Sequence, residues 1–366
     1  MPVRTDSGIR LALPGKGALE TATLAFLAEC GMKVNRSNPR QYLARIGSMP
    51  GLEVVFQRAT DIPALVQDGD AALGITGYDI LVEHRGQSDD EADEDDHDDD
   101  IIMLERDLGF GACRLVVAVP ETWIDVSTCA DLWHLAGYYI TQKGRGLRIA
   151  TKYPALTAQF LRRHGITHCK IVSPHGALEA APLTDMADLI VDLTETGTTL
   201  RENHLKLLED GVVLRSQACL IANGCLLGEN KQALHMASIM LELIDARMQA
   251  RNRSMLTAHL QVESVEKISQ ISKQLRARIS GFEFRIASSD TYDGPATNVG
   301  RDTAGSYGYS IAGVVSVGNT TSELLETVAV LRSVGAIHID VTPLTYRFEQ
   351  ESVRVRSLRE RLKRMR

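Results

Sequence analysis

Residues 187–203, ADLIVDLTETGTTLREN, constrain the fold more than any other stretch of this chain. The apolar run at 187–193 is rich in β-branched and aliphatic residues and holds only two aspartates, which predicts a buried strand. A polar loop follows at 194–198, and over 199–211 leucines recur with helical spacing before a glycine. The sequence therefore predicts a strand, a short loop and a helix in direct succession.

The loop between the predicted strand and helix has the composition of a phosphate site. Amides at the start of a helix point into the preceding loop, and the helix dipole favours negative charge there. Glycine lets the backbone approach a ligand closely, and threonines add hydroxyl donors. The residues predicted to hold the phosphate are Glu195, Thr196, Gly197, Thr198 and Thr199. An ordinary capped turn would have the same threonines, so the loop alone leaves both interpretations open.

Two acids beside the loop favour a particular ligand. Asp192 and Glu195 are hydrogen-bond acceptors, which a bare phosphate does not need. The ring hydroxyls of a phosphorylated sugar do need acceptors, and carboxylates bind them directly or through a metal ion. The pattern therefore indicates a sugar-phosphate site.

A second strand, glycine loop and helix stand near the N-terminus. The strand is predicted at 9–13, and Lys16 lies in the loop before a helix that stops at Gly31. Lys16 could hold a phosphate or pyrophosphate, although a solvated surface lysine would look the same. A further strand, 52–56, ends beside Arg58.

The next strand candidate is followed by a second glycine-containing turn. A short helix is predicted at 62–67 and the strand at 70–76. Two glycines around a threonine indicate close approach of a ligand, but a tight turn explains them equally. The residues concerned are Gly74, Thr76, Gly77 and Asp79.

The chain after about residue 252 has the pattern of a compact unit. Strands are predicted at 255–260, 282–287, 311–317 and 337–341, with helices at 262–276 and from Thr320, where Glu323 completes a capping box. The order βαββαβ is that of the ferredoxin-like fold. A long helical stretch, 231–251, precedes it.

Charge and hydropathy exclude two classes of function. No apolar run approaches the roughly 20 residues of a membrane helix, and we expect no signal peptide, because the first residues hold no apolar segment long enough for one. Residues 89–100 hold ten of the 47 acids, which leaves 37 acids against 40 bases elsewhere. We therefore expect a disordered acidic loop on a nearly neutral protein, with neither a membrane nor a nucleic acid as partner. The basic tail after Arg354 is expected to be a solvated helical end.

Cysteines and histidines give no metal motif in the sequence. The six cysteines form no CxxC pair, so we expect buried free thiols in a reducing cytoplasm, not disulfides or a zinc site. His164 and His168 have the i,i+4 spacing of helical metal ligands, but Gly165 breaks the helix between them. We interpret both as surface histidines.

The run from Glu179 to Leu200, EAAPLTDMADLIVDLTETGTTL, resembles the signature of the ATP phosphoribosyltransferase family. The shared pattern is a glutamate, an Ala-Pro pair, an Ala-Asp pair before the strand, then an aspartate and a Thr-Gly-x-Thr-Leu loop. Other segments match the family at the right separations, and the resemblance covers nearly the whole chain. They are LALPGKGAL (11–19), DIPALVQDGDAALGITGYDIL (61–81), LGFGACRLVVAV (108–119) and GAIHIDVTPL (335–344).

The resemblance implies an α/β core of two lobes, each like a periplasmic-binding-protein domain, around a catalytic cleft. Lobe I would hold residues 1–110, with the chain returning to it over 187–250, and lobe II residues 111–186. A ferredoxin-like regulatory domain at 252–350 and a basic tail at 351–366 would follow. Assembly as homodimers and hexamers in the cytoplasm is also implied.

The family's reaction joins N1 of the adenine of ATP to C1 of phosphoribosyl pyrophosphate, with Mg²⁺, and releases pyrophosphate. The resemblance implies that 195–199 hold the 5′-phosphate, while Asp192 and Glu179 face the ribose or its magnesium, with Asp192 the candidate metal ligand. Lys16, together with Arg58, would neutralise pyrophosphate. ATP contacts are expected from Arg58, Gly74, Thr76, Gly77 and Asp79. Histidine would bind the C-terminal unit as a feedback inhibitor.

The chain departs from the family pattern at three places. Ala18 stands where many members have an arginine, and neither the acidic stretch 89–100 nor the glycine-rich loop 288–307 has a counterpart. Two other classes of protein therefore stay open. One is a non-catalytic two-lobed receptor for a small anion, which the fold alone would allow. The other is a catalytically dead regulatory partner, to which the missing arginine points.

Overall fold

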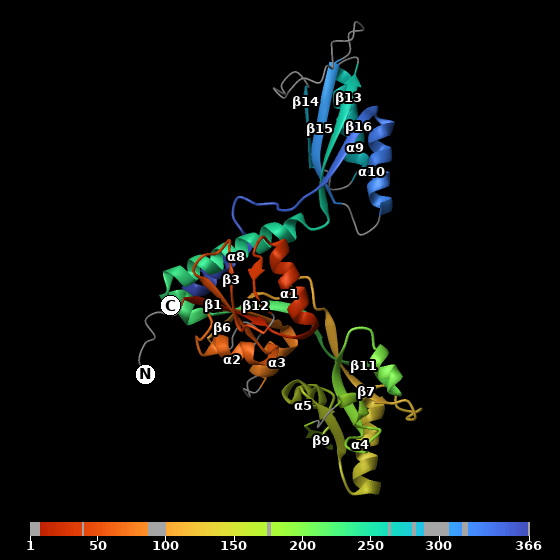
Figure 1. The fold of residues 1–366 in the computed structure, drawn as a ribbon. Helices are drawn as coiled ribbons and strands as arrows, with labels where there is room; N and C mark the ends of the chain where they lie inside the picture. The colour runs from red at the N-terminus through yellow and green to blue at the C-terminus, as the bar shows by residue number, and fades with distance from the viewer. Residues whose placement is uncertain are drawn as a thin grey trace. The chain divides into compact units, whose positions relative to one another are not determined.

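The computed structural model describes residues 8–38, 40–86, 100–173, 177–262, 265–279, 283–288, 307–316 and 321–364. Two compact units make up the chain (Figure 1): residues 1–239 with 357–366, and residues 240–356. The first unit contains two α/β lobes, each with its own sheet. The predictions for the acidic stretch 89–100, for the 288–307 loop and for Thr320 lie outside the described residues, except at Asp100, Ser288 and Tyr307.

Lobe I is built on a seven-stranded sheet of order β2-β3-β4-β1-β5-β12-β6. Its central strands are parallel, since β1 pairs in parallel with β4 and β5, while β12 pairs antiparallel with β5 and β6. The strands are β1 (Ile9–Pro14), β2 (Val34–Asn35), β3 (Leu43–Ile46), β4 (Leu52–Gln57), β5 (Leu73–Gly77), β6 (Ile101–Glu105) and β12 (Ala218–Asn223). The connecting helices are α1 (Gly17–Glu29), α2 (Ile62–Gln67), α3 (Tyr78–Arg85), α7 (Gly224–Glu229) and α8 (Lys231–Ala250).

Lobe II is built on a five-stranded sheet of order β11-β7-β10-β8-β9. The parallel strands β8, β9 and β10 point their carboxyl ends to one edge, and β7 runs antiparallel to them. The strands are β7 (Cys113–Pro120), β8 (Leu147–Thr151), β9 (Cys169–Val172), β10 (Leu189–Thr194) and β11 (Leu205–Ser216). The helices are α4 (Cys129–Lys143), α5 (Pro154–Arg163), α6 (Thr198–Glu202) and the 3-10 turn Leu178–Ala180.

The chain returns from lobe II to lobe I later than the sequence predicts. The predicted return at 187 is wrong, because β10 pairs with β7 and β8 inside the lobe II sheet. β11 also pairs with β7, and the chain re-enters the lobe I sheet only with β12. A buried apolar strand such as β10 fits either sheet by composition, so strand pairing decides its lobe.

The long helix predicted over 199–211 is also wrong. The structure has only the five residues of α6, after which β11 runs antiparallel to β7. Leu205, Leu208 and Gly211 are all buried, which mimics a helical period. The three-residue spacing comes from a bulge, since residues 208–211 lie opposite Val117 alone.

The C-terminal unit has the predicted βαββαβ order. It consists of β13 (Arg253–Val262), α9 (Val265–Arg278), β14 (Glu283–Ser288), β15 (Tyr307–Ser316), α10 (Thr321–Ser333) and β16 (Ala336–Pro343). Its antiparallel sheet has the order β14-β15-β13-β16, the ferredoxin-like arrangement. The predicted fold class is therefore confirmed: a two-lobed α/β core with a ferredoxin-like unit. No helix among the described residues is long and apolar enough to cross a membrane.

The basic tail is a packed helix, not the solvated end that the sequence predicts. In α11 (Val353–Arg364), the side chains of Val355, Leu358 and Leu362 are buried at a spacing of three to four residues. Arg361 donates a hydrogen bond of 2.7 Å to the Met103 carbonyl of β6. The charged residues therefore cover one face of an amphipathic helix whose other face is core.

We expect Leu358→Ala to destabilise the protein by about 2–5 kcal/mol, because it removes a side chain that is 1% exposed and leaves a cavity. Arg359→Ala, at the neighbouring exposed position, should change stability by less than about 0.5 kcal/mol. Thermal unfolding of both variants measures the difference. Equal melting temperatures would show that α11 does not support the fold.

Candidate functional site

Charged residues follow the strands at one sheet edge in each lobe. In sheets of parallel strands, ligands bind at the carboxyl ends of the strands. In lobe II, Lys152 directly follows β8 and Glu195 directly follows β10. In lobe I, Gly15 donates a backbone hydrogen bond of 2.8 Å to Gln57, so Lys16 and Arg58 follow neighbouring strands at one edge.

The loop after β10 is ordered by its own threonines. The Gly197 amide donates a hydrogen bond of 2.8 Å to the Thr194 hydroxyl, and the hydroxyls of Thr196 and Thr198 lie 2.9 Å apart. Gly197 has φ +79°, a conformation that side chains rarely adopt. Four residues of the loop, Glu195, Thr196, Thr198 and Thr199, are exposed. A ligand can therefore reach their side chains.

The short α6 changes the physical basis of the predicted cradle. A five-residue helix has a small dipole, so an anion at this loop would depend on hydrogen-bond donors. One further donor is Arg201, whose guanidinium lies 3.4 Å from the Thr198 hydroxyl. The sequence reasoning missed Arg201, although a basic residue two positions after the Thr-Thr pair was a signal for it.

Asp192 lies in β10 as a half-buried carboxylate close to other charges. Burial raises the pKa of this carboxyl, the Leu193 amide at 2.8 Å opposes the rise, and the negative charge of Glu179 adds to it. The positive charge of Lys152 lowers the pKa. The structure thus brings Asp192, Glu179 and Lys152 within electrostatic range of one another. Lys152 was missed, although its position after a predicted strand could have found it.

The predicted Gly74–Asp79 turn is mostly packed inside lobe I. A Cβ at Gly74 would meet Ile62 at 2.6 Å, and the buried Thr76 hydroxyl donates a hydrogen bond of 2.8 Å to the Ala59 carbonyl. Gly77 is the N-cap residue of α3, and a Cβ there would meet Asp79 at 2.5 Å. Packing and turn geometry account for these residues, whereas Lys16 and Arg58 at the same edge are exposed.

Asp79 joins the two lobes. Its carboxylate, 3% exposed, accepts hydrogen bonds of 2.5 Å from Ser216 and 2.7 Å from the Tyr153 hydroxyl. Burial and the charge of Asp79 raise the pKa of Tyr153, and the charge of Asp192 raises it further. The tyrosine therefore lies between an acid of each lobe and stays protonated. Neither Tyr153 nor Ser216 carried a signal in the sequence.

The aspartate of the Ala-Asp pair before β10 has a structural role. Asp188 accepts hydrogen bonds of 2.6 and 2.8 Å from Arg145 and one of 2.7 Å from the Arg148 amide. Burial alone would raise the pKa of this carboxyl, but the two arginines outweigh it and hold the pKa well below its usual range. Asp188 thereby ties the start of β10 to β8.

Comparison with known proteins finds sequences that are similar to this chain. The family model described as ATP phosphoribosyltransferase matches residues 58–249. The chain is 36% identical over 346 residues to ATP phosphoribosyltransferase 2, chloroplastic, of Arabidopsis thaliana, covering 94% of this chain and 78% of that protein. It is 45% identical over 216 residues to ATP phosphoribosyltransferase of Brucella melitensis, covering 58% and 89% respectively.

A solved structure aligns with part of the chain. It is the ATP phosphoribosyl transferase (HisG:HisZ) complex from Thermotoga maritima, at 26% identity and a TM-score of 0.47, covering 65% of this chain and 98% of that one. The assignment to a family depends on the sequence matches alone.

We expect Asp188→Asn to lower stability by about 2 kcal/mol at neutral pH, since it removes the charge that the two arginines share. The folded-state pKa is depressed, so the stabilisation is present above the ordinary carboxyl pKa of about 3.9 and is lost as pH falls below it. Unfolding at pH 7 and at pH 3 measures this, and the gap between wild type and variant should shrink at pH 3.

Asp185→Asn is the matched control for this change. The Asp185 side chain also pairs with Arg148, but it is 92% exposed. Its backbone has φ +55°, which asparagine tolerates as well as aspartate. An effect of Asp185→Asn equal to that of Asp188→Asn would contradict the structural role of Asp188.

Proposed function

This chain belongs to the ATP phosphoribosyltransferase family, whose reaction is the first step of histidine biosynthesis, and we propose that Asp192, Glu179 and Lys16 carry that reaction. The reaction transfers the phosphoribosyl group of phosphoribosyl pyrophosphate to N1 of the adenine of ATP and releases pyrophosphate. The observation that carries the assignment of roles is a half-buried carboxylate, Asp192, three residues before an exposed threonine loop.

The chemistry needs positioning and charge neutralisation instead of a protein nucleophile. The attacked C1 becomes cation-like, so carboxylates facing the ribose stabilise the charge that develops there. Asp192 and Glu179 are suited to this, because each lies in the electrostatic field of the other. Pyrophosphate leaves as a strong anion, and holding it beside a cation is sufficient.

The loop Glu195–Thr199 is proposed to hold the 5′-phosphate. The exposed hydroxyls of Thr196 and Thr198 are donors that face solvent, and Arg201 adds a positive charge beside them. Glu195 supplies an acceptor for a ribose hydroxyl. The αL backbone at Gly197 supports this role, because it turns the chain at the point where the ligand must approach.

Mg²⁺ fits the acids of the same region. Oxygen ligands are the ones that Mg²⁺ prefers, and Asp192 with Glu179 provides carboxylates whose mutual repulsion a cation relieves. Asp192 is the proposed ligand. The ion would neutralise charge on the pyrophosphate, while the chain itself positions the ribose. The positive charge of Lys152 partly offsets the rise that burial causes in the pKa of Asp192.

Lobe I is proposed to supply the groups for pyrophosphate and ATP. Lys16 and Arg58 are exposed cations at the ends of adjacent parallel strands, β1 and β4. Ala18 has no charge to offer, so these two must replace the arginine that many relatives have there. Gly74, Thr76, Gly77 and Asp79 would contribute to ATP binding through the shape of the turn, since all four residues are buried.

Regulation and assembly follow from the family as further proposals. The plant relative matches 94% of this chain, so it shares most of the C-terminal unit, which we propose binds histidine as a feedback inhibitor. Assembly as homodimers and hexamers is a further proposal that rests on membership of the family. The six free cysteines support a reducing compartment such as the cytoplasm.

One assay tests the reaction. ATP, phosphoribosyl pyrophosphate and Mg²⁺ together should give pyrophosphate and an adduct with raised near-ultraviolet absorbance, and omission of any one should abolish the product. Asp192→Asn should lower kcat by about 100-fold or more, because it removes charge that stabilises the transition state. Added histidine should inhibit the wild-type rate.

The outcomes distinguish the alternatives. No adduct with all three components present, but binding of phosphoribosyl pyrophosphate that Asp192→Asn leaves unchanged, would identify a non-catalytic receptor. No adduct and restored activity only in the presence of another protein would identify a regulatory partner.

The phosphate loop makes a separate prediction. Thr198→Ala should raise the KM for phosphoribosyl pyrophosphate by about tenfold, since one charge-assisted hydrogen bond is lost, and leave the KM for ATP nearly unchanged. Gly197→Val should have a larger effect, because valine at φ +79° is strained. The exposed Glu202→Gln in α6 serves as the control. Equal losses for both substrates would show that the phosphate lies elsewhere.

A further inference from the structure

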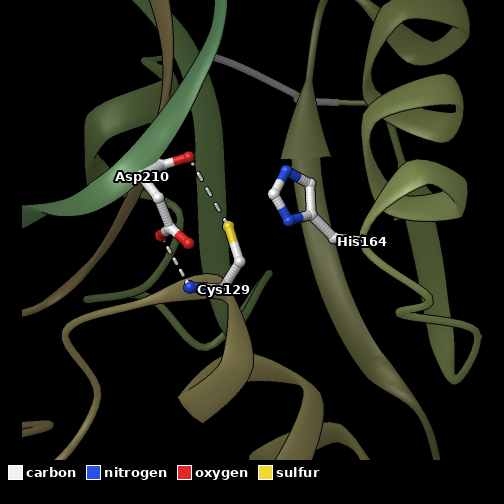
Figure 2. A group of neighbouring side chains, drawn as sticks. All are labelled: Cys129, His164 and Asp210. Atoms are coloured by element: carbon white, nitrogen blue, oxygen red, sulfur yellow. Dashed lines mark hydrogen bonds between the residues drawn. The ribbon is translucent and has the colours of Figure 1, made fainter.

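Three side chains with metal-binding atoms meet in lobe II, and none of them belongs to the residues proposed to carry the reaction. Cys129, His164 and Asp210 place one sulfur, one ring nitrogen and one carboxylate oxygen within 4.8 Å of one another. Figure 2 shows the imidazole of His164 facing the Cys129 sulfur, with Asp210 on the other side of the sulfur. Among the described residues, no other group of three such side chains comes this close together. The three residues come from α4, the end of α5 and β11.

Each side chain has a separate structural cause for its position. Cys129 is the first residue of α4 and is 2% exposed, while His164 ends α5 and is exposed. Asp210 lies in the bulge of β11, where Gly211 has no room for a Cβ because Leu208 would lie 2.8 Å away. A bulge re-aims side chains, and here it directs Asp210 to the start of α4.

The existing contacts leave ligand atoms available. Asp210 accepts a 2.7 Å hydrogen bond from the Cys129 amide through Oδ1, which leaves Oδ2 for another partner. The Cys129 sulfur lies 3.7 Å from the Asp210 carbonyl oxygen. The centroid of the His164 ring lies 4.4 Å from that of Phe160, with the two rings tilted by 41°, and this contact orients the imidazole. Its nitrogens have no hydrogen-bond partner within the described part of the chain.

We propose that Cys129, His164 and Asp210 form a binding site for a zinc-like divalent cation. Zinc ligands lie about 2.0–2.3 Å from the metal, which places tetrahedral ligands about 3.5 Å apart. The three ligand atoms now lie within 4.8 Å of one another, so side-chain shifts of about 1 Å bring them to the spacing of tetrahedral zinc ligands. Three protein ligands leave the fourth position to water. The sulfur and nitrogen ligands select Zn²⁺ or Co²⁺ over Mg²⁺.

Binding requires the thiolate of Cys129. Burial raises the pKa of this thiol to about 12, and Asp210 contributes to the rise, so the free protein holds the proton. On binding, the S–H bond breaks, the S–metal bond forms and the proton leaves to solvent. The exposed His164 and Asp210 give the ion its path to the buried sulfur.

The site is separate from the proposed reaction centre. α5 begins directly after Lys152 and Tyr153 at the carboxyl edge of β8, and His164 follows its ten residues. A helix of that length spans about 15 Å, so His164 lies at the opposite end of the lobe from Lys152. A cation here would join α4, α5 and β11 without touching the substrates. It also revises the expectation that the cysteines and His164 have no role with metals.

Titration of the full chain with Co²⁺ in excess Mg²⁺ tests the proposal. We expect saturable binding of one ion per chain, a thiolate-to-cobalt charge-transfer band in the near ultraviolet, tetrahedral visible bands, and displacement by Zn²⁺ with a raised melting temperature. Cys129→Ser should abolish the charge-transfer band. Loss of even an outer-shell partner costs about 10–100-fold in affinity, so His164→Gln should weaken binding at least about tenfold.

His168→Gln is the matched control, because His168 is also exposed but lies outside the group. His164 is at the surface, so its variant should fold even if a change at the buried Cys129 disturbs the lobe. Equal affinity in the His164 and His168 variants would overturn the proposal. Absence of saturable binding, or binding without the charge-transfer band, would overturn it as well.

Discussion

A carboxylate of lobe I caps the N-terminus of a helix in lobe II, and the arrangement of the proposed site depends on this contact. Glu83 of α3 accepts hydrogen bonds of 2.9 Å from the amides of Ala155 and Leu156. Those amides begin α5 and have no partner within the helix, and the helix dipole favours the negative charge. Burial raises the pKa of Glu83 and the two amides oppose the rise, so the carboxylate is held in place by the bonds it makes.

The consequences reach the residues of the proposed reaction. Because α5 starts beside Lys152 and Tyr153, fixing its first turn fixes where these two lie relative to lobe I. Asp79 repeats the connection one helical turn earlier in α3, through Tyr153 and Ser216. The charges of Asp79 in lobe I and Asp192 in lobe II both raise the pKa of the Tyr153 hydroxyl. The contact between the lobes therefore contributes to the electrostatics around Asp192. The ends of β1 and β4 then supply the positive charges of Lys16 and Arg58.

Local patterns predicted much of the fold, and two failures show their limit. The strand before the threonine loop, the end of α1 before Gly31 and the C-terminal βαββαβ order were all visible, because they depend on neighbours in sequence. The helix over 199–211 failed because a bulge placed Leu205, Leu208 and Gly211 on the buried side at helical spacing. The prediction of a solvated tail failed because the many charged residues obscured the helical spacing of three buried apolar ones, Val355, Leu358 and Leu362.

The sequence by itself determined the family, since the match to it extends over residues 58–249, and it also gave the composition on which the proposal for the threonine loop depends. Only the tertiary structure decided that β10 and β11 belong to lobe II, that Asp79 is used between lobes, and that Asp188 is structural. It alone brought Cys129, His164 and Asp210 together. The reason is physical: strand pairing and burial join residues far apart in the chain, and no local spacing records which partner each will find.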